Sequence, residues 1–80
     1  MNEEILDLII KRAAEVFGVD ESTLSGDTHF EDDLQAKSAN IVLITTVLED
    51  EYDVEIPYME FRRKKTFQEA ADFIEELVEG

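Results

Sequence analysis

The sequence predicts an all-α fold, a small four-helix bundle with three main helices and one short helix. Apolar residues repeat at helical spacing near both ends of the 80-residue chain. A third apolar run lies in the middle, and the chain offers no second strand with which it could pair. The length predicts a single domain, residues 1–80, near the lower size at which a chain without disulfides folds.

The first helix is predicted over residues 3–17, where apolar side chains follow helical spacing. Asn2 is a candidate N-cap, and Glu3 and Glu4 suit the positive end of the helix dipole. Gly18 is typical of the residue that ends a helix.

Residues 19–36 predict a long ordered loop, because this stretch is rich in Asp, Ser, Thr and Gly. Its isolated apolar residues, Leu24, Phe30 and Leu34, are expected to anchor the loop to the core. A long ordered loop in so small a domain is often functional.

The second helix is predicted over residues 38–53, although its apolar run Ile41–Leu48 is β-branched and favours a buried strand by propensity alone. A lone strand would leave its backbone unpaired, whereas a helix packs Val42, Leu48 and Tyr52 against the flanking helices. Helix is therefore the better interpretation.

Pro57 ends the preceding segment, and residues 58–63 predict a short helix. The last helix is predicted over residues 66–78, where Thr66 and Glu69 form a capping-box pattern before an apolar stripe. The predicted core takes apolar residues from all these segments: Ile9, Phe17, Leu24, Phe30, Leu34, Val42, Leu48, Ile56, Phe67, Ala71 and Ile74.

The charge is strongly acidic, with 21 acidic and 7 basic side chains and a net charge of −14. Such a chain repels nucleic acid and anionic membranes and attracts basic protein surfaces. Four of the bases form the run Arg62–Lys65, which either neutralises the acids of residues 49–55 or forms a second docking surface; neutralisation is the preferred interpretation. No secretion signal or membrane-length apolar stretch is present, so a cytoplasmic location is expected. The protein is also expected to be a monomer.

Ser38 is the candidate functional residue, and it has no neighbouring histidine or carboxylate pattern that would make it a self-activated nucleophile. From the residues alone it is an N-cap serine. The single histidine, His29, is expected to be a loop residue, and the acidic clusters lack the ligand order of a calcium loop, so no specific metal site is predicted. The chain has no cysteine, so sulfur chemistry would require an attached group.

The segment Phe30-Glu-Asp-Asp-Leu34, Lys37-Ser38-Ala39-Asn40, the apolar run to Leu48 and Glu55-Ile56-Pro57 resembles, in order and spacing, the acyl carrier protein family. The resemblance extends from Ile5 to Val78. It implies a non-catalytic carrier in which a phosphopantetheinyl transferase, the holo-carrier synthase, attaches 4′-phosphopantetheine covalently to Ser38. It further implies that the terminal thiol holds acyl groups as thioesters for loading and transferring enzymes with basic docking surfaces.

Relative to the family pattern, Lys37 replaces an aspartate, Ala39 a leucine, Asn40 an acid and Leu43 a glutamate. These departures predict a specialised carrier for a dedicated fatty-acid, lipid or related pathway. Lys37 is either a contact of the phosphodiester or a solvated lysine. The residues expected to bind partners lie along the second helix: Asn40, Ile41, Leu43, Glu49 and Asp50.

Two alternatives stay open. An unmodified acidic interaction module with the carrier fold would bind a basic partner by charge and through Leu43. A peptidyl or aminoacyl carrier would use the same serine, and the acidic end of the second helix disfavours it.

Overall fold

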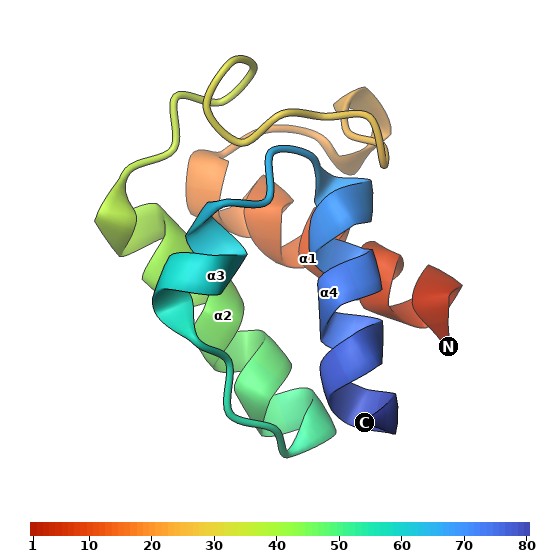
Figure 1. Cartoon of the computed structure of the whole chain (residues 1–80). Coiled ribbons are helices and arrows are strands. Elements are labelled where there is room, and N and C mark those ends of the chain that lie inside the picture. Colours follow the sequence, from red (N-terminus) through yellow and green to blue (C-terminus); the bar gives the residue numbers. More distant parts are fainter.

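The computed structural model describes all 80 residues and confirms the all-α fold. The elements are α1 (Asn2–Phe17), the 3₁₀ turn η1 (Glu21–Thr23), α2 (Ser38–Tyr52), α3 (Tyr58–Arg62) and α4 (Phe67–Glu79). α1 packs against both α2 and α4, the short α3 contacts α2, and the long loop runs across one end of the bundle (Figure 1). Every predicted helix boundary lies within one residue of the observed one. None of the helices combines the length and the apolar character needed to span a membrane.

The end of α1 follows the sequence prediction and its start does not. Gly18 has a left-handed backbone (φ 67°), and its N–H donates to the carbonyl oxygen of Ala14, which ends the helix. Asn2 is not the N-cap; Met1 holds that position without a side-chain cap. The Asn2 amide instead donates to Asp72 Oδ1 (2.9 Å) and Glu75 Oε1 (3.0 Å) of α4, so that it ties the two terminal helices together.

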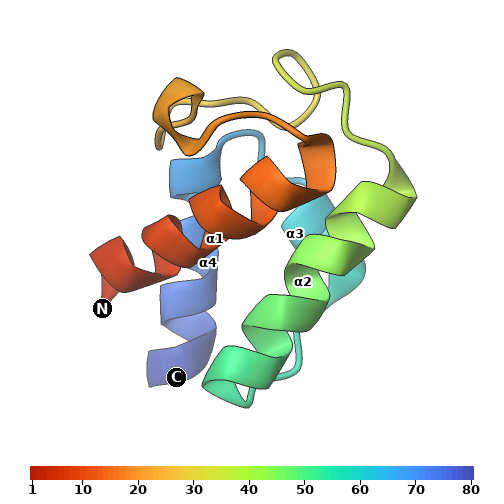
Figure 2. The same ribbon diagram turned by 180° about the vertical axis from the view of Figure 1, so that it is seen from behind.

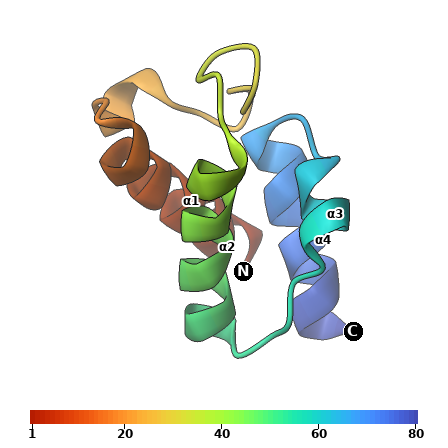
Figure 3. The ribbon, with the colours of Figure 1, turned by 90° about the vertical axis from the view of Figure 1, so that its left-hand side faces the viewer.

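The long loop between η1 and α2 is fastened to the connection between α3 and α4 by backbone hydrogen bonds. Phe30 N–H donates to Lys65 O (3.0 Å), and Phe67 N–H donates to Thr28 O (3.0 Å). The Phe30 ring is buried, with its centroid 4.7 Å from that of Phe67 and 5.9 Å from that of Phe61. The loop is therefore an ordered cover over the end of the bundle, which Figure 3 shows from the side.

The face of α2 that enters the core differs from the predicted one. Ile41, Ile44 and Leu48 are almost fully buried, whereas Val42 is 46% exposed. The buried positions follow the helical spacing i, i+3 and i+7, which excludes Val42 from the core. The prediction for Val42 was wrong because residues 41–44 are all apolar, so none of them marks the side of the helix that meets solvent.

The remaining core is largely as predicted. Thr66 caps α4, because its hydroxyl accepts the Glu69 N–H at 3.1 Å. The Glu69 carboxylate accepts the N–H of Lys65 at 3.0 Å, whereas in a capping box it would accept the N–H of Thr66. Phe17 and Leu34 are only half-buried and pack against the core from outside. The predicted residues that are buried are Ile9, Leu24, Phe30, Leu48, Ile56, Phe67, Ala71 and Ile74.

Candidate functional site

Ser38 is the first residue of α2 and is exposed to solvent. The long loop runs directly into this end of the helix (Figure 2). The N-cap is Lys37, with an extended backbone, so the interpretation of Ser38 as the N-cap was wrong. The Ser38 hydroxyl takes part in no hydrogen bond within the chain. A serine at this position therefore has a side chain that is free to react with a partner.

The start of α2 is held by Asn40 rather than by Ser38. The backbone N–H of Lys37 donates to Asn40 Oδ1 at 2.9 Å, and Asn40 is half-buried. An amide at this position performs the task that glutamate or glutamine performs in a capping box. Asn40, predicted as a partner contact, thus also has a structural role in fixing the backbone on either side of Ser38.

The electrostatic environment of Ser38 favours an anion. The backbone N–H groups of Ser38, Ala39 and Asn40 have no backbone partner in the chain, as is usual in the first turn of a helix. No acidic side chain lies in this turn, and the exposed Lys37 adds a positive charge next to the serine. The helix dipole acts in the same direction.

The exposed face of α2 carries an apolar pair. Leu43 is 45% exposed, as predicted, and its exposed neighbour is Val42. Ile41 was predicted to share this surface, and that prediction was wrong, because its side chain is 1% exposed and lies in the core. The sequence could have revealed Val42 only if the phase of the helix had been known.

The two acidic residues predicted as docking contacts differ in their surroundings. Glu49 is half-buried, and its Oε2 accepts the N–H of Ile56 at 2.9 Å, so this carboxylate fixes the segment after α2. Asp50 is exposed and makes no hydrogen bond or ion pair. Asp50 is therefore the freer of the two carboxylates for an intermolecular contact.

The chain does not assemble a catalytic group around Ser38. His29 lies in the long loop, where its Nδ1 is 3.1 Å from the carbonyl oxygen of Asp27 and 3.8 Å from Asp33 Oδ2. No group of three or more histidine or carboxylate side chains is placed to hold a metal ion. The site is thus an exposed hydroxyl at a helix start, not a nucleophile activated by its own chain.

Two groups outside the site, a carboxyl and a phenol, have shifted pKa values. The pKa of Asp20 is lowered because its carboxylate accepts the N–H of Ser22 (2.9 Å) at the start of η1. The pKa of Tyr52 is raised above its usual 10.0, first by burial and then by the negative charges of Glu4 and Glu51. Neither group lies in the first turn of α2, so these shifts concern the fold rather than Ser38.

Comparison with known proteins gives one consistent result. Residues 7–74 match the sequence model of the family described as "Phosphopantetheine attachment site". The chain is also 38% identical over 74 residues to the acyl carrier protein of Rubrobacter xylanophilus, an alignment that covers 92% of this chain and 91% of that protein.

Proposed function

Since this chain belongs to the acyl carrier protein family, whose domain is the attachment site of phosphopantetheine, we propose that Ser38 is the residue that carries the group. Proteins of this family are carriers and not catalysts. The observation that supports Ser38 is its position: an exposed hydroxyl without an intramolecular hydrogen bond, at the first residue of α2.

The surroundings of Ser38 fit a phosphodiester. The negative charge of a phosphodiester on Ser38 would lie beside the unpaired N–H groups of the first turn and the positive end of the helix dipole. The ammonium group of Lys37, which forms no ion pair with any carboxylate of the chain, is the side chain proposed to contact the phosphate. The absence of acidic residues from this turn removes the repulsion that such an anion would otherwise meet.

When bound, the group supplies the thiol on which acyl chains are carried as thioesters, a function that no side chain of this cysteine-free protein could perform. The chain itself contributes the hydroxyl, the N–H groups around it and an ordered helix start. Because no general base lies beside Ser38, a partner phosphopantetheinyl transferase is proposed to supply the base and the magnesium ion.

Partner enzymes are proposed to contact the exposed face of α2. Val42 and Leu43 provide an apolar contact, and the exposed carboxylate of Asp50 provides a negative charge for a basic partner. Lys37 and Leu43 replace acids of the family pattern on this surface. These differences support a specialised carrier that serves a dedicated fatty-acid, lipid or related pathway.

The test is intact mass spectrometry of the protein after incubation with coenzyme A and each of several phosphopantetheinyl transferases. A gain of one phosphopantetheine group is expected in the wild type and in Ser22→Ala, which removes another exposed serine. The gain is expected to disappear in Ser38→Ala. Modification of Ser38→Ala to the wild-type extent would overturn the assignment.

The second candidate is an unmodified acidic interaction module with the same fold. The exposed pair Val42 and Leu43, together with the lack of acids in the first turn of α2, favours it over an ordinary carrier surface. No mass gain with any transferase would favour this function.

A further inference from the structure

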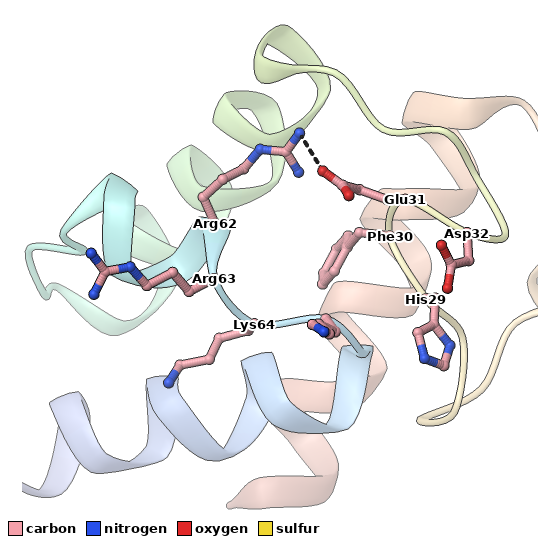
Figure 4. Close-up of a pocket in the computed structure, with 8 residues that line it drawn as sticks. His29, Phe30, Glu31, Asp32, Arg62, Arg63 and Lys64 are labelled. Atoms are coloured by element: carbon pink, nitrogen blue, oxygen red, sulfur yellow. Dashed lines mark ion pairs between the residues drawn. The ribbon is translucent and has the colours of Figure 1, made fainter.

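One hollow on the protein is lined mostly by charged side chains, and Ser38 is not part of its lining. It has a volume of about 390 Å³ and is formed where the loop residues His29–Asp32 meet Arg62, the last residue of α3, and the following residues 63–65 (Figure 4). Phe30 is the only apolar residue that lines it. Most of the residues that line it carry a charge, so it can offer ionic contacts to an occupant.

The charge of this hollow is opposite to that of the molecule. Four of the seven basic side chains of the protein line it, against the two carboxylates of Glu31 and Asp32. Only Arg62 is ion-paired: its Nη2 lies 3.1 Å from Glu31 Oε1 and also donates to the carbonyl oxygen of Ala36 at 3.3 Å. Arg63, Lys64 and Lys65 have no carboxylate within ion-pair distance.

No ion pair joins this run to the acids of residues 49–55, so their expected neutralisation by the run involves no direct contact. The three bases without ion pairs, Arg63, Lys64 and Lys65, are called the basic surface below. Bases that have no carboxylate of the chain within ion-pair distance remain available to the carboxylates of a partner.

The arrangement of the basic surface suits an extended ligand. Figure 4 shows Arg62 turned toward Glu31, while Arg63 and Lys64 point away from that pair and do not converge on a common point. Lys64 is partly fixed, because its Nζ lies 5.0 Å from the centre of the Phe73 ring. Diverging cations do not enclose one small anion, whereas an extended acidic segment that crosses them can pair with each in turn.

We propose that the basic surface is a docking site for a short acidic segment of a partner protein. At physiological ionic strength charges are screened beyond about 8 Å, so a segment at the surface responds to the local bases more than to the net charge of −14. A second copy of the chain brings its own net charge of −14 to the contact, which opposes self-association. The proposal goes beyond carriage at Ser38 and does not depend on modification of that residue.

The experiment is a titration of the ¹⁵N-labelled protein with a peptide of ten glutamates, followed by backbone amide chemical shifts at about 0.1 M salt. We expect saturable shifts in residues 29–32 and 62–65. Arg63→Glu and Lys65→Glu should each weaken binding about fivefold or more, because each replaces an attraction with a repulsion. The neutral variant Lys65→Gln should weaken it less, and it remains informative if charge reversal disturbs the fold.

Lys11→Glu is the matched control, because Lys11 is exposed on α1, has no ion pair and gives the same change in net charge as Lys65→Glu. Binding in this variant should stay within about twofold of the wild type. Ser38→Ala should bind the peptide unchanged, which separates this test from that of the carrier function.

Parallel titrations use inorganic phosphate and a single-stranded DNA 10-mer in place of the peptide.

The absence of saturable shifts, or equal losses in Lys11→Glu and Lys65→Glu, would overturn the proposal. It would also be overturned if inorganic phosphate produced the same shifts at similar concentrations, which would indicate a small-anion site. Tighter binding of the DNA than of the peptide would overturn it as well and would indicate a nucleic-acid surface.

Discussion

Replacement of Ile44 by alanine is expected to remove a large part of the stability of this protein. Ile44 lies on the core face of α2 with 0% exposure, while the neighbouring Leu43 is 45% exposed. The two side chains are isomers, so they differ in position rather than in size. The pair therefore isolates the effect of burial at one point of the helix.

The expected magnitudes follow from these exposures. Truncating a fully buried isoleucine to alanine costs about 2–5 kcal/mol, because transfer free energy is lost and a cavity remains. Leu43→Ala leaves no enclosed cavity and removes a side chain that is already half solvated, so about 1 kcal/mol or less is expected. At roughly 0.05–0.15 kcal/mol per residue, the 80-residue chain has about 4–12 kcal/mol in total. We therefore expect Ile44→Ala to leave the fold only marginally stable.

The assay is urea unfolding followed by helical circular dichroism, with the free energy of unfolding taken from the midpoint and the slope. A large loss for Ile44→Ala and a small one for Leu43→Ala would support the observed register of α2. Equal losses, or a greater loss for Leu43→Ala, would refute it and place the helix in a different rotation about its axis.

Two further predictions concern the start and the end of α2. Asn40→Ala should lower the free energy of unfolding by about 0.5–1.5 kcal/mol and speed amide exchange at Lys37, because the N–H of Lys37 loses its acceptor. Asn40→Asp keeps an acceptor at this position, so an equal loss of stability in both variants would contradict the capping role of Asn40. Because the pKa of Tyr52 is raised in the folded protein, the unfolded chain loses this phenol proton first as pH rises. The contribution of Tyr52 to the free energy of unfolding is therefore complete below about pH 10 and declines above it. Urea unfolding at about pH 9 and 11 should show a smaller alkaline loss for Tyr52→Phe than for the wild type, and identical losses would count against the shift.

The candidate site could be predicted only in part from the sequence. The order of motifs around Ser38 pointed to that residue by its resemblance to a family, and the exposure of Leu43 was predicted correctly. The N-cap was misassigned because both Lys37 and Ser38 precede the apolar run, and local pattern does not decide which of the two has the extended backbone. Ile41 was placed on the surface for a related reason, since the four residues from Ile41 to Ile44 are all apolar and none of them marks the face that meets solvent.

Local signals were sufficient to predict most of the secondary structure. The apolar repeats of α1 and α4, the stop at Gly18 and the cap at Thr66 depend on residues within one or two helical turns of each other. Periodicity also made the inner faces of these two helices readable, because polar residues interrupt their apolar stripes. Composition indicated the long loop, and its isolated apolar residues Leu24 and Phe30 are buried as anchors.

Contacts between residues that are distant in the chain could not be predicted from the sequence, because they depend on how the helices pack together. Asn2 contacts α4 instead of capping α1, and the direct ion pair of Arg62 is with Glu31 of the long loop. The buried face of α2 was selected in the same way, because the apolar residues 41–44 are compatible with several rotations of the helix and the neighbouring helices favour one. Local sequence sets the backbone conformation of α1 and α4, whereas the helical state of α2 and the choice among contacts depend on what the rest of the folded chain brings within reach.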